Sequence, residues 1–213
     1  MSTMDETRLN AGTASLALFD FDGTITQREM FPDFVHRVVA PRRLAIGKLL
    51  LAPLIIGYKL GWVSGSVVRA AIVRFGFTGI DVATFEAKGR AFADAVLVDC
   101  LRPEAMQRIR WHQARGDTVV VVSGAFDVYL KHWCKTQQLA VICSSLAQEN
   151  GVLTGRYAGP QCVGMQKAAR VRERYDLASY ARIYAYGDTK EDLDLLALAH
   201  EPYYQWQPLS PAK

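Results

Sequence analysis

Buried-strand patterns alternate with amphipathic patterns along most of the chain. Apolar runs with few charged residues predict strands at residues 16–19, 118–122, 139–143 and 182–186. Helical spacing of apolar residues predicts helices at 104–115, 123–137, 167–175 and 191–199. Asn150-Gly151 separates two apolar stretches and predicts a hairpin over 146–157, whereas residues 201–213 are expected to pack as an irregular edge. Strands that alternate with helices predict an α/β fold with a parallel sheet.

The segment 30–92 interrupts this alternation because it shows no strand pattern. Its apolar residues recur at helical spacing, with breaks at Pro41, Pro53, Gly57 and Gly61. The segment lies between the first and second predicted strands, so it predicts an all-helical insertion. We therefore expect a core formed by residues 1–29 and 93–213 and a separate helical domain of residues 30–92.

Composition favours one well-formed core with a small insertion. The chain has 213 residues, of which 50% are hydrophobic and 22% are charged. Four cysteines lack metal-binding spacing, which favours reduced thiols in a cytosolic protein. Residues 1–15 are polar and contain no signal-peptide pattern. We expect a loose arm over the first dozen residues and a cytoplasmic location, with a possible peripheral position at the inner face of the membrane.

Charge is distributed unevenly, although the net charge is only +4. Residues 34–80 contain no Asp or Glu and seven basic residues, so this span carries +7 and the remainder carries −3. A cationic span of this kind attracts anionic partners. The span has no nucleic-acid reader motif and few aromatic residues, so no nucleic-acid partner is expected.

The strand at 16–19 runs directly into Asp20 and Asp22. Open parallel sheets bind their ligands at the carboxyl ends of their strands, so both carboxylates are expected at one site. Two close carboxylates repel each other unless a cation or a shared proton holds them. The pattern indicates a metal-assisted site in which one carboxylate attacks and the other transfers protons.

Three later positions offer complementary chemistry. Ser123-Gly124 stands where a strand is expected to give way to a helix, and a helix N-terminus binds phosphate or carries an ordinary cap. Asp188 follows a predicted strand and Asp192 lies one helical turn later, so both can face one ion or serve as N-terminal helix acids. Lys167 is expected at a helix start, where it would offset negative charge or lie at the surface.

Four stretches in this order resemble the signature motifs of the haloacid dehalogenase-like hydrolases, a superfamily dominated by phosphatases. The subfamily resembled contains phosphoserine phosphatase and phosphatidylglycerophosphatase C. The resemblance implies a Rossmann-like parallel sheet with helices on both faces and a helical cap domain at 30–92. The four stretches are residues 16–26, 119–127, 162–167 and 184–196.

The resemblance also implies a role for each candidate residue. Asp20 is the expected nucleophile that forms an aspartyl-phosphate, and Asp22 is the expected general acid and base. Lys167 pairs with the nucleophile and the phosphate, and Ser123 and Gly124 bind the phosphate. The implied cofactor is Mg²⁺, held by Asp20, the backbone carbonyl of Asp22, Asp188 and Asp192.

The substrate has two interpretations. In phosphoserine phosphatases a Glu at the place of Glu29 contacts the substrate's amino group, although Glu29 could simply start the first cap helix. Those enzymes also use a cap Arg for the substrate carboxylate, and Arg69 is not clearly in register with it. They carry Asn where this chain has Glu191, and both departures count against phosphoserine.

A lipid phosphate is the other interpretation. Residues 49–58 form an uncharged run between Lys48 and Lys59, too short to span a bilayer and split by Pro53. Residues 44–63 could lie in a membrane interface with Trp62 at headgroup depth, or could form the core of the cap. The leading hypothesis is a Mg²⁺-dependent hydrolase of a small or lipid phosphate monoester. Phosphoserine phosphatase proper and a non-catalytic phosphate-binding module are the alternatives, and the sequence sets no oligomeric state.

Overall fold

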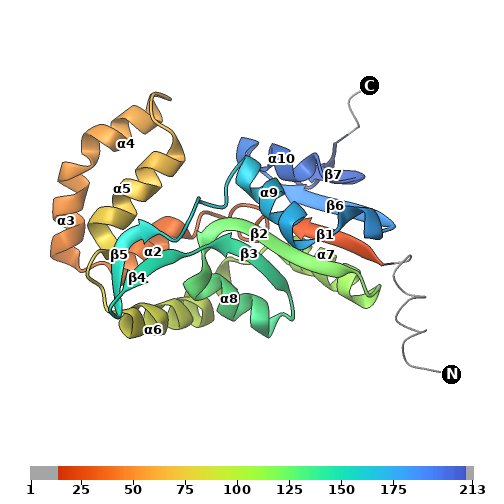
Figure 1. Ribbon diagram of the computed structural model, residues 1–213, viewed down its shortest axis with the longest axis horizontal. Helices are drawn as coiled ribbons and strands as arrows, with labels where there is room; N and C mark the ends of the chain where they lie inside the picture. Colours follow the sequence, from red (N-terminus) through yellow and green to blue (C-terminus); the bar gives the residue numbers. More distant parts are fainter. Residues whose placement is uncertain (1–13, 210–213) are drawn as a thin grey trace.

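A computed structural model describes residues 14–209 and places a six-stranded sheet at the centre of the molecule (Figure 1). The strand order is β3-β2-β1-β6-β7-β8, and only β8 pairs antiparallel to its neighbour. The predicted α/β fold with a parallel sheet is confirmed. The strands are β1 (Ser15–Phe19), β2 (Thr118–Phe126), β3 (Ala140–Ser144), β6 (Arg182–Gly187), β7 (Glu201–Tyr204) and β8 (Gln207–Pro208).

Alternate residues of the central strands supply two hydrophobic clusters, one on each face of the sheet. Successive side chains of a strand point to opposite faces, so Phe19 and Leu18 belong to different clusters. Helices α7 (Pro103–Ala114) and α8 (Asp127–Thr136) contribute to the first cluster. Helices α9 (Met165–Arg174) and α10 (Leu193–Leu196) contribute to the second. The sheet is therefore covered on both faces.

Helices fill the chain between β1 and β2. A π-helical turn (Ala93–Leu97) and a 3₁₀ turn (Val98–Cys100) then return the chain to the sheet. The hairpin of β4 (Leu146–Glu149) and β5 (Val152–Tyr157) packs against this insertion, because Gly155 approaches Arg74 O and Thr78 closely. The inserted helices are α2 (Phe31–Val38), α3 (Pro41–Leu50), α4 (Ala52–Lys59), α5 (Gly65–Phe77) and α6 (Val82–Phe92).

Aromatic packing joins the insertion to the sheet. The Phe34 ring contacts Phe92, Phe126 and Tyr129 at centroid distances of 5.2, 5.9 and 4.9 Å. All four rings belong to one buried cluster that also contains Phe19 of β1. Helices α2 and α6 thus share a core with the sheet, while α3 and α4 lie at the end of the molecule away from β6 and β7 (Figure 1). The domain boundary at residues 30–92 stays a prediction.

Three predicted elements are wrong in extent. The helix expected over 191–199 is a 3₁₀ turn (Lys190–Asp192) followed by the four-residue helix α10. The helix expected from residue 123 begins at Asp127, because β2 continues through Ser123 to Phe126 and bulges against β3. The irregular edge expected over 201–213 contains a regular strand, β7, which pairs parallel to β6. The predicted N-terminal arm and the last four residues of the predicted edge lie outside the described residues.

Candidate active site

Asp20 and Asp22 follow β1 at the carboxyl edge of the sheet. The Asp20 N–H donates to Tyr186 O at 2.9 Å, which holds the residue in the register of the neighbouring strand. Asp20 is buried, and Asp22 Oδ1 accepts a hydrogen bond from Met30 N at 2.8 Å. The main chain therefore fixes both carboxylates before any ligand arrives.

Close packing brings Asp188 to the loop that follows these two residues. Gly23 has φ +81°, and a Cβ there would lie 2.2 Å from Asp188 Oδ2. The Thr24 hydroxyl donates to Asp188 Oδ1 at 2.9 Å. Glycine is required at position 23 both for its left-handed backbone and for the approach of the carboxylate.

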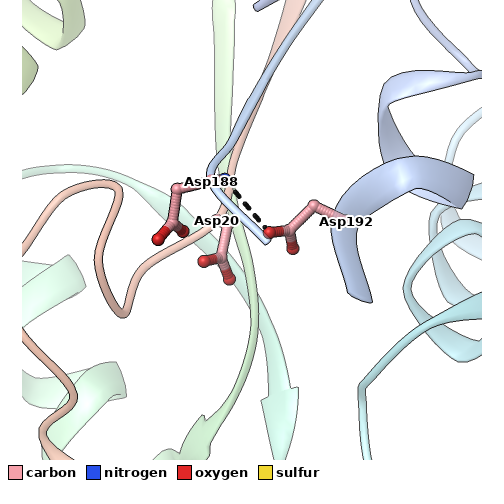
Figure 2. Close-up of side chains that lie close together, drawn as sticks. All are labelled: Asp20, Asp188 and Asp192. Carbon is pink, nitrogen blue, oxygen red and sulfur yellow. Dashed lines mark hydrogen bonds between the residues drawn. The ribbon is translucent and has the colours of Figure 1, made fainter. Parts of the chain in front are cut away.

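Asp192 lies in a 3₁₀ turn (Lys190–Asp192), beside the carboxylates of Asp20 and Asp188 (Figure 2). Its Oδ2 accepts from Asp188 N, Thr189 N and the Thr189 hydroxyl at 3.2, 2.9 and 2.9 Å. Its Oδ1 accepts from Lys167 Nζ at 2.5 Å. Burial opposes the charge of Asp192, but Lys167 and the Thr189 donors outweigh burial and lower its pKa.

Lys167 bridges Asp20 and Asp192 from the first turn of α9. Its Nζ donates to Asp20 Oδ1 and to Asp192 Oδ1, and the side chain is buried. Burial disfavours the ammonium, but the two carboxylates outweigh burial and raise the pKa of Lys167. A fixed positive charge therefore lies against the predicted nucleophile.

The pKa of Asp22 is raised to about 7, first by burial and then by the nearby carboxylate of Glu29. The hydrogen bond from Met30 N opposes this rise. An acid with a pKa near neutrality is suited to give and take protons. Burial also raises the pKa of Asp20, although the ammonium of Lys167 opposes this rise, so the two carboxylates differ in their partners.

Asp20, Asp22 and Lys167 line a cavity of about 40 Å³, a volume with room for a few water molecules. Ser123 and Gly124 form part of its wall in the bulged end of β2 rather than at a helix start. Ser123 Oγ accepts from Ala125 N at 3.1 Å and keeps its own O–H to donate. The predicted phosphate-binding residues thus lie at the cavity, but the helix N-terminus expected there does not.

Arg69 and Glu191, which were not among the predicted site residues, lie at the mouth of this cavity. Arg69 of α5 donates to Glu191 Oε1 and Oε2 at 3.1 and 3.2 Å and to Gln161 Oε1 at 3.3 Å. Glu29 lies at the same mouth, where partial loss of hydration raises the pKa of its carboxylate despite the charge of Arg69. The two positions that depart from phosphoserine phosphatases, Arg69 and Glu191, therefore pair with each other.

Three carboxylates could hold a metal ion. Asp20, Asp188 and Asp192 each offer an oxygen within 4.8 Å of the others, the one such group found among residues 14–209. Mg²⁺ prefers oxygen ligands of this kind, so the donor set fits the predicted cofactor. The carboxylate of Asp22 is not part of the group, which leaves only its backbone carbonyl as a predicted ligand.

Four small residues around the carboxylates were not among the predicted site residues. Gly187 lets Asp192 approach, because a Cβ there would lie 2.5 Å from Asp192 Cβ. Thr189 and Asp192 form a capping box, and the spacing of Thr-x-x-Asp was a usable signal for it. Gly23 and Thr24 contact Asp188, which is far away in the sequence. No local sequence pattern could therefore have predicted these two contacts.

Carboxylates at the carboxyl ends of parallel strands are typical of α/β enzymes, which bind their ligands at that edge of the sheet. The family model of haloacid dehalogenase-like hydrolases matches residues 17–197, and the chain belongs to this family. It is therefore an enzyme, a hydrolase. This family membership confirms the resemblance inferred from the four motifs.

Two curated proteins are similar to this chain in sequence. Protein CicA of Caulobacter vibrioides (strain NA1000 / CB15N) is 32% identical over 194 residues, 89% of this chain and 85% of that protein. Histidinol-phosphatase of Neisseria meningitidis serogroup C is 28% identical over 120 residues, 53% of this chain and 54% of that protein.

Two solved structures share the fold. A protein of unknown function from Bordetella pertussis Tohama I matches with a TM-score of 0.76 and 22% identity, covering 90% of each chain. A phospho-aspartyl intermediate analogue of phosphoserine phosphatase matches with a TM-score of 0.62 and 20% identity, covering 90% of this chain and 86% of that one. At this identity the likeness concerns the fold.

Proposed function

We propose that the protein is a phosphatase that hydrolyses phosphate monoesters with Mg²⁺, using Asp20 as the nucleophile. The observation that carries the proposal is the buried pair of Asp20 and Lys167 in a cavity large enough for a phosphoryl group. The family membership and the phosphatase among its relatives support the same reaction.

The reaction has two steps. An Asp20 oxygen attacks phosphorus, the bond to the ester oxygen breaks, and Asp22 gives that oxygen a proton. Asp22 then takes a proton from water, and the hydroxide displaces the phosphoryl group from Asp20 as inorganic phosphate. Lys167 offsets the negative charge that accumulates, and Ser123 and the Gly124 backbone bind the phosphoryl oxygens.

Asp20, Asp188 and the backbone carbonyl of Asp22 would hold Mg²⁺, with Asp192 beside them. When bound, the ion would lower the repulsion between the carboxylates and the phosphoryl oxygens. Both oxygens of Asp192 accept hydrogen bonds from Lys167, Asp188 N and Thr189. We therefore assign Asp192 mainly to the positioning of Lys167.

A substrate with an apolar substituent is favoured by the surroundings of the cavity. Phe31 lines both the carboxylate cavity and an apolar pocket of about 210 Å³ between α2, α3, α4 and α5. Arg43 and Lys48 also line this pocket and suit an anionic ligand. Apolar side chains form most of the rest, including Leu44, Leu51, Ile55, Ile72 and Phe75.

Phosphoserine is the second candidate, favoured by the position of Glu29 at the cavity mouth. It requires a cation for the substrate carboxylate, and the cap arginine nearest to the cavity is already bound to Glu191. A lipid phosphate monoester needs no such cation. We therefore rank it above phosphoserine.

Phosphate release from a panel of monoesters, with Mg²⁺ and with EDTA, tests the proposal. The panel contains phosphoserine, nucleotides, sugar phosphates and lipid phosphates, and it is repeated with the Asp20→Asn variant. An Asp99→Asn variant is the matched control, because Asp99 is exposed on the 3₁₀ turn Val98–Cys100 and does not line the cavity. We expect release that needs both Mg²⁺ and Asp20.

The panel also separates the candidates. A preferred lipid phosphate supports the role of the apolar pocket, and a preference for phosphoserine would reassign the substrate to Glu29. Turnover in EDTA after dialysis, or turnover by the Asp20→Asn variant, would contradict the proposed mechanism. Mg²⁺ binding without turnover of any member would favour the non-catalytic phosphate-binding module.

A further inference from the structure

The outer surface of α3 and α4 is covered with large apolar side chains. Leu49 is 77% exposed and Trp62, just after α4, is 80% exposed. Single exposed hydrophobic residues are ordinary, whereas seven large ones within residues 46–62 indicate an interaction surface. We call residues 42–62 the hairpin surface; its exposed apolar members are Ile46, Leu49, Leu50, Ile56, Tyr58, Leu60 and Trp62.

Two glycines make the tightest inward contacts of this segment, beside the partly buried Leu44, Leu51 and Ile55. Gly47 and Gly57 are the buried residues of α3 and α4. A Cβ at Gly47 would lie 2.8 Å from the Phe75 ring of α5, and one at Gly57 would lie 3.0 Å from Val63 Cγ2. An ordinary surface helix turns its bulky apolar side chains inward, whereas Ile46, Leu49 and Leu50 of α3 are exposed. The cap core that the sequence allowed for residues 44–63 therefore does not account for the exposed leucines.

Positive charges lie among the apolar side chains. Arg42, Lys48 and Lys59 are exposed on the same two helices. Residues 34–80 contain no acidic residue, so nothing in this segment neutralises them. An apolar helix surface with basic residues and a tryptophan is the composition of a segment that lies in a membrane interface.

We infer that the hairpin surface binds the interface of a bilayer that contains anionic lipids. Figure 1 places α3 and α4 at one end of the molecule, where a flat membrane can reach them without contact with the sheet. None of the helices in residues 14–209 combines the length and the apolar character needed to cross a bilayer, so the contact is peripheral. A second copy of this chain fits less well, because two cationic surfaces would face each other.

Vesicle sedimentation with the full chain tests the inference, independently of any catalysis. We expect the protein to sediment with phosphatidylcholine vesicles that contain phosphatidylglycerol and to bind less as salt rises. Replacing Lys48 or Lys59 with Gln should weaken binding about fivefold each, because one basic residue near an anionic surface contributes about 1 kcal/mol. Arg110→Gln and Lys135→Gln, exposed on α7 and α8, are the matched controls and should leave binding unchanged.

The apolar contribution needs its own variant. Leu49→Glu with Trp62→Glu should abolish sedimentation while the thermal midpoint is retained, because both side chains are exposed. Val98→Glu with Leu209→Glu makes the same charge change at exposed apolar residues outside the hairpin surface and should bind as the wild type does.

Trp62 also reports its own depth. Lipids brominated along the acyl chain should quench part of the tryptophan fluorescence, and Trp62→Phe should remove that quenching, although Trp111, Trp133 and Trp206 remain. Absence of binding to anionic vesicles, or equal loss in the two double-Glu variants, would overturn the inference. A dimer in solution that the Leu49→Glu and Trp62→Glu changes dissociate, without vesicle binding, would assign the surface to a second copy instead.

Discussion

At the scale of single residues, Lys167 links the two halves of the site. Its Nζ donates to Asp20, which follows β1, and to Asp192, which follows β6. Removal of one partner from a buried charge network leaves the others uncompensated. The lysine therefore serves both the stability of the site and the charge balance of the proposed reaction.

Lys167→Met is expected to lower kcat by about 10²- to 10³-fold, the loss typical of a removed transition-state donor. It should also lower the free energy of unfolding by about 3–5 kcal/mol, because two buried carboxylates lose their cation. Turnover of the best panel substrate and urea unfolding measure the two effects, with Lys135→Met as the control. A variant with normal turnover would exclude Lys167 from the reaction.

A second buried group predicts how stability depends on pH. His112 is fully buried, with Nδ1 2.8 Å from Asp117 Oδ2 and Nε2 2.9 Å from the Tyr186 hydroxyl. Burial lowers the pKa of His112, and Asp117 opposes this only in part. Between the lowered native pKa and about 6.5 the unfolded chain binds more protons than the native one.

The free energy of unfolding should therefore fall as pH drops below about 6.5. Each pKa unit of difference contributes about 1.4 kcal/mol. Urea unfolding between about pH 5 and pH 7 measures how the free energy of unfolding changes with pH. We expect this change to be smaller for His112→Gln than for the wild type. His36→Gln, at an exposed histidine, is the control, and an equal slope in His112→Gln and the wild type would contradict the assignment.

The candidate residues differ in how far sequence could reveal them. Asp20, Asp22 and Asp188 follow strands that the apolar pattern predicts, so their meeting at one edge could be expected. Lys167 lies within reach of Asp20, as the motif implied, whereas the role of each residue in catalysis stays a prediction. The pairing of Arg69 with Glu191 depends on how α5 lies over the sheet, which no local pattern encodes.

At the scale of elements, α6 and α8 fix the insertion to the sheet through a close backbone contact. A Cβ at Gly89 of α6 would lie 2.5 Å from Val128 Cγ2 and 2.7 Å from Val128 O. Backbone cannot move aside as a flexible side chain can, so the two helices would have to separate.

Gly89→Ala is therefore expected to lower the free energy of unfolding by about 1–3 kcal/mol, the usual cost of overpacking. Gly65→Ala in α5 is the matched control, since its nearest neighbour would be 3.4 Å away. Alanine favours a helix over glycine, so the control should be neutral or slightly stabilising. Equal thermal midpoints for the two variants would contradict the described packing.

The wrong extents of β2 and of the C-terminal edge have physical explanations. The β-branched run ends at Val122, yet Ser123 to Phe126 remain in β2 because they pair with β3 through a bulge. The strand β7 contains Pro202, which argues against a strand in sequence. It nevertheless pairs with β6, and long-range pairing of this kind overrides local propensity.

At the scale of the whole molecule, the insertion closes over the carboxylates through few polar contacts. Arg69 binds Glu191 and Gln161, and Gln161 Nε2 donates to Ser66 O at 2.7 Å. The cavity beneath has room for only a few waters, so a substrate larger than phosphate needs these contacts to open.

Glu191→Gln should loosen this closure. An exposed ion pair contributes about 0.2–1 kcal/mol, so amide exchange in α5 should rise by up to about fivefold. Exchange in β1 should stay unchanged, and Glu173→Gln on α9 is the matched control. Unaltered exchange of Gly65–Phe77 in Glu191→Gln would show that the closure does not depend on this pair.

The central claim is that Asp20 carries the phosphoryl group during turnover. Acid quenching of the reacting enzyme, followed by peptide mass spectrometry, tests it most directly. The account predicts a phosphoryl group on the peptide that contains Asp20, with Mg²⁺ and a preferred monoester present, and neither label nor turnover in Asp20→Asn. A label on another residue, or normal turnover by Asp20→Asn, would contradict it.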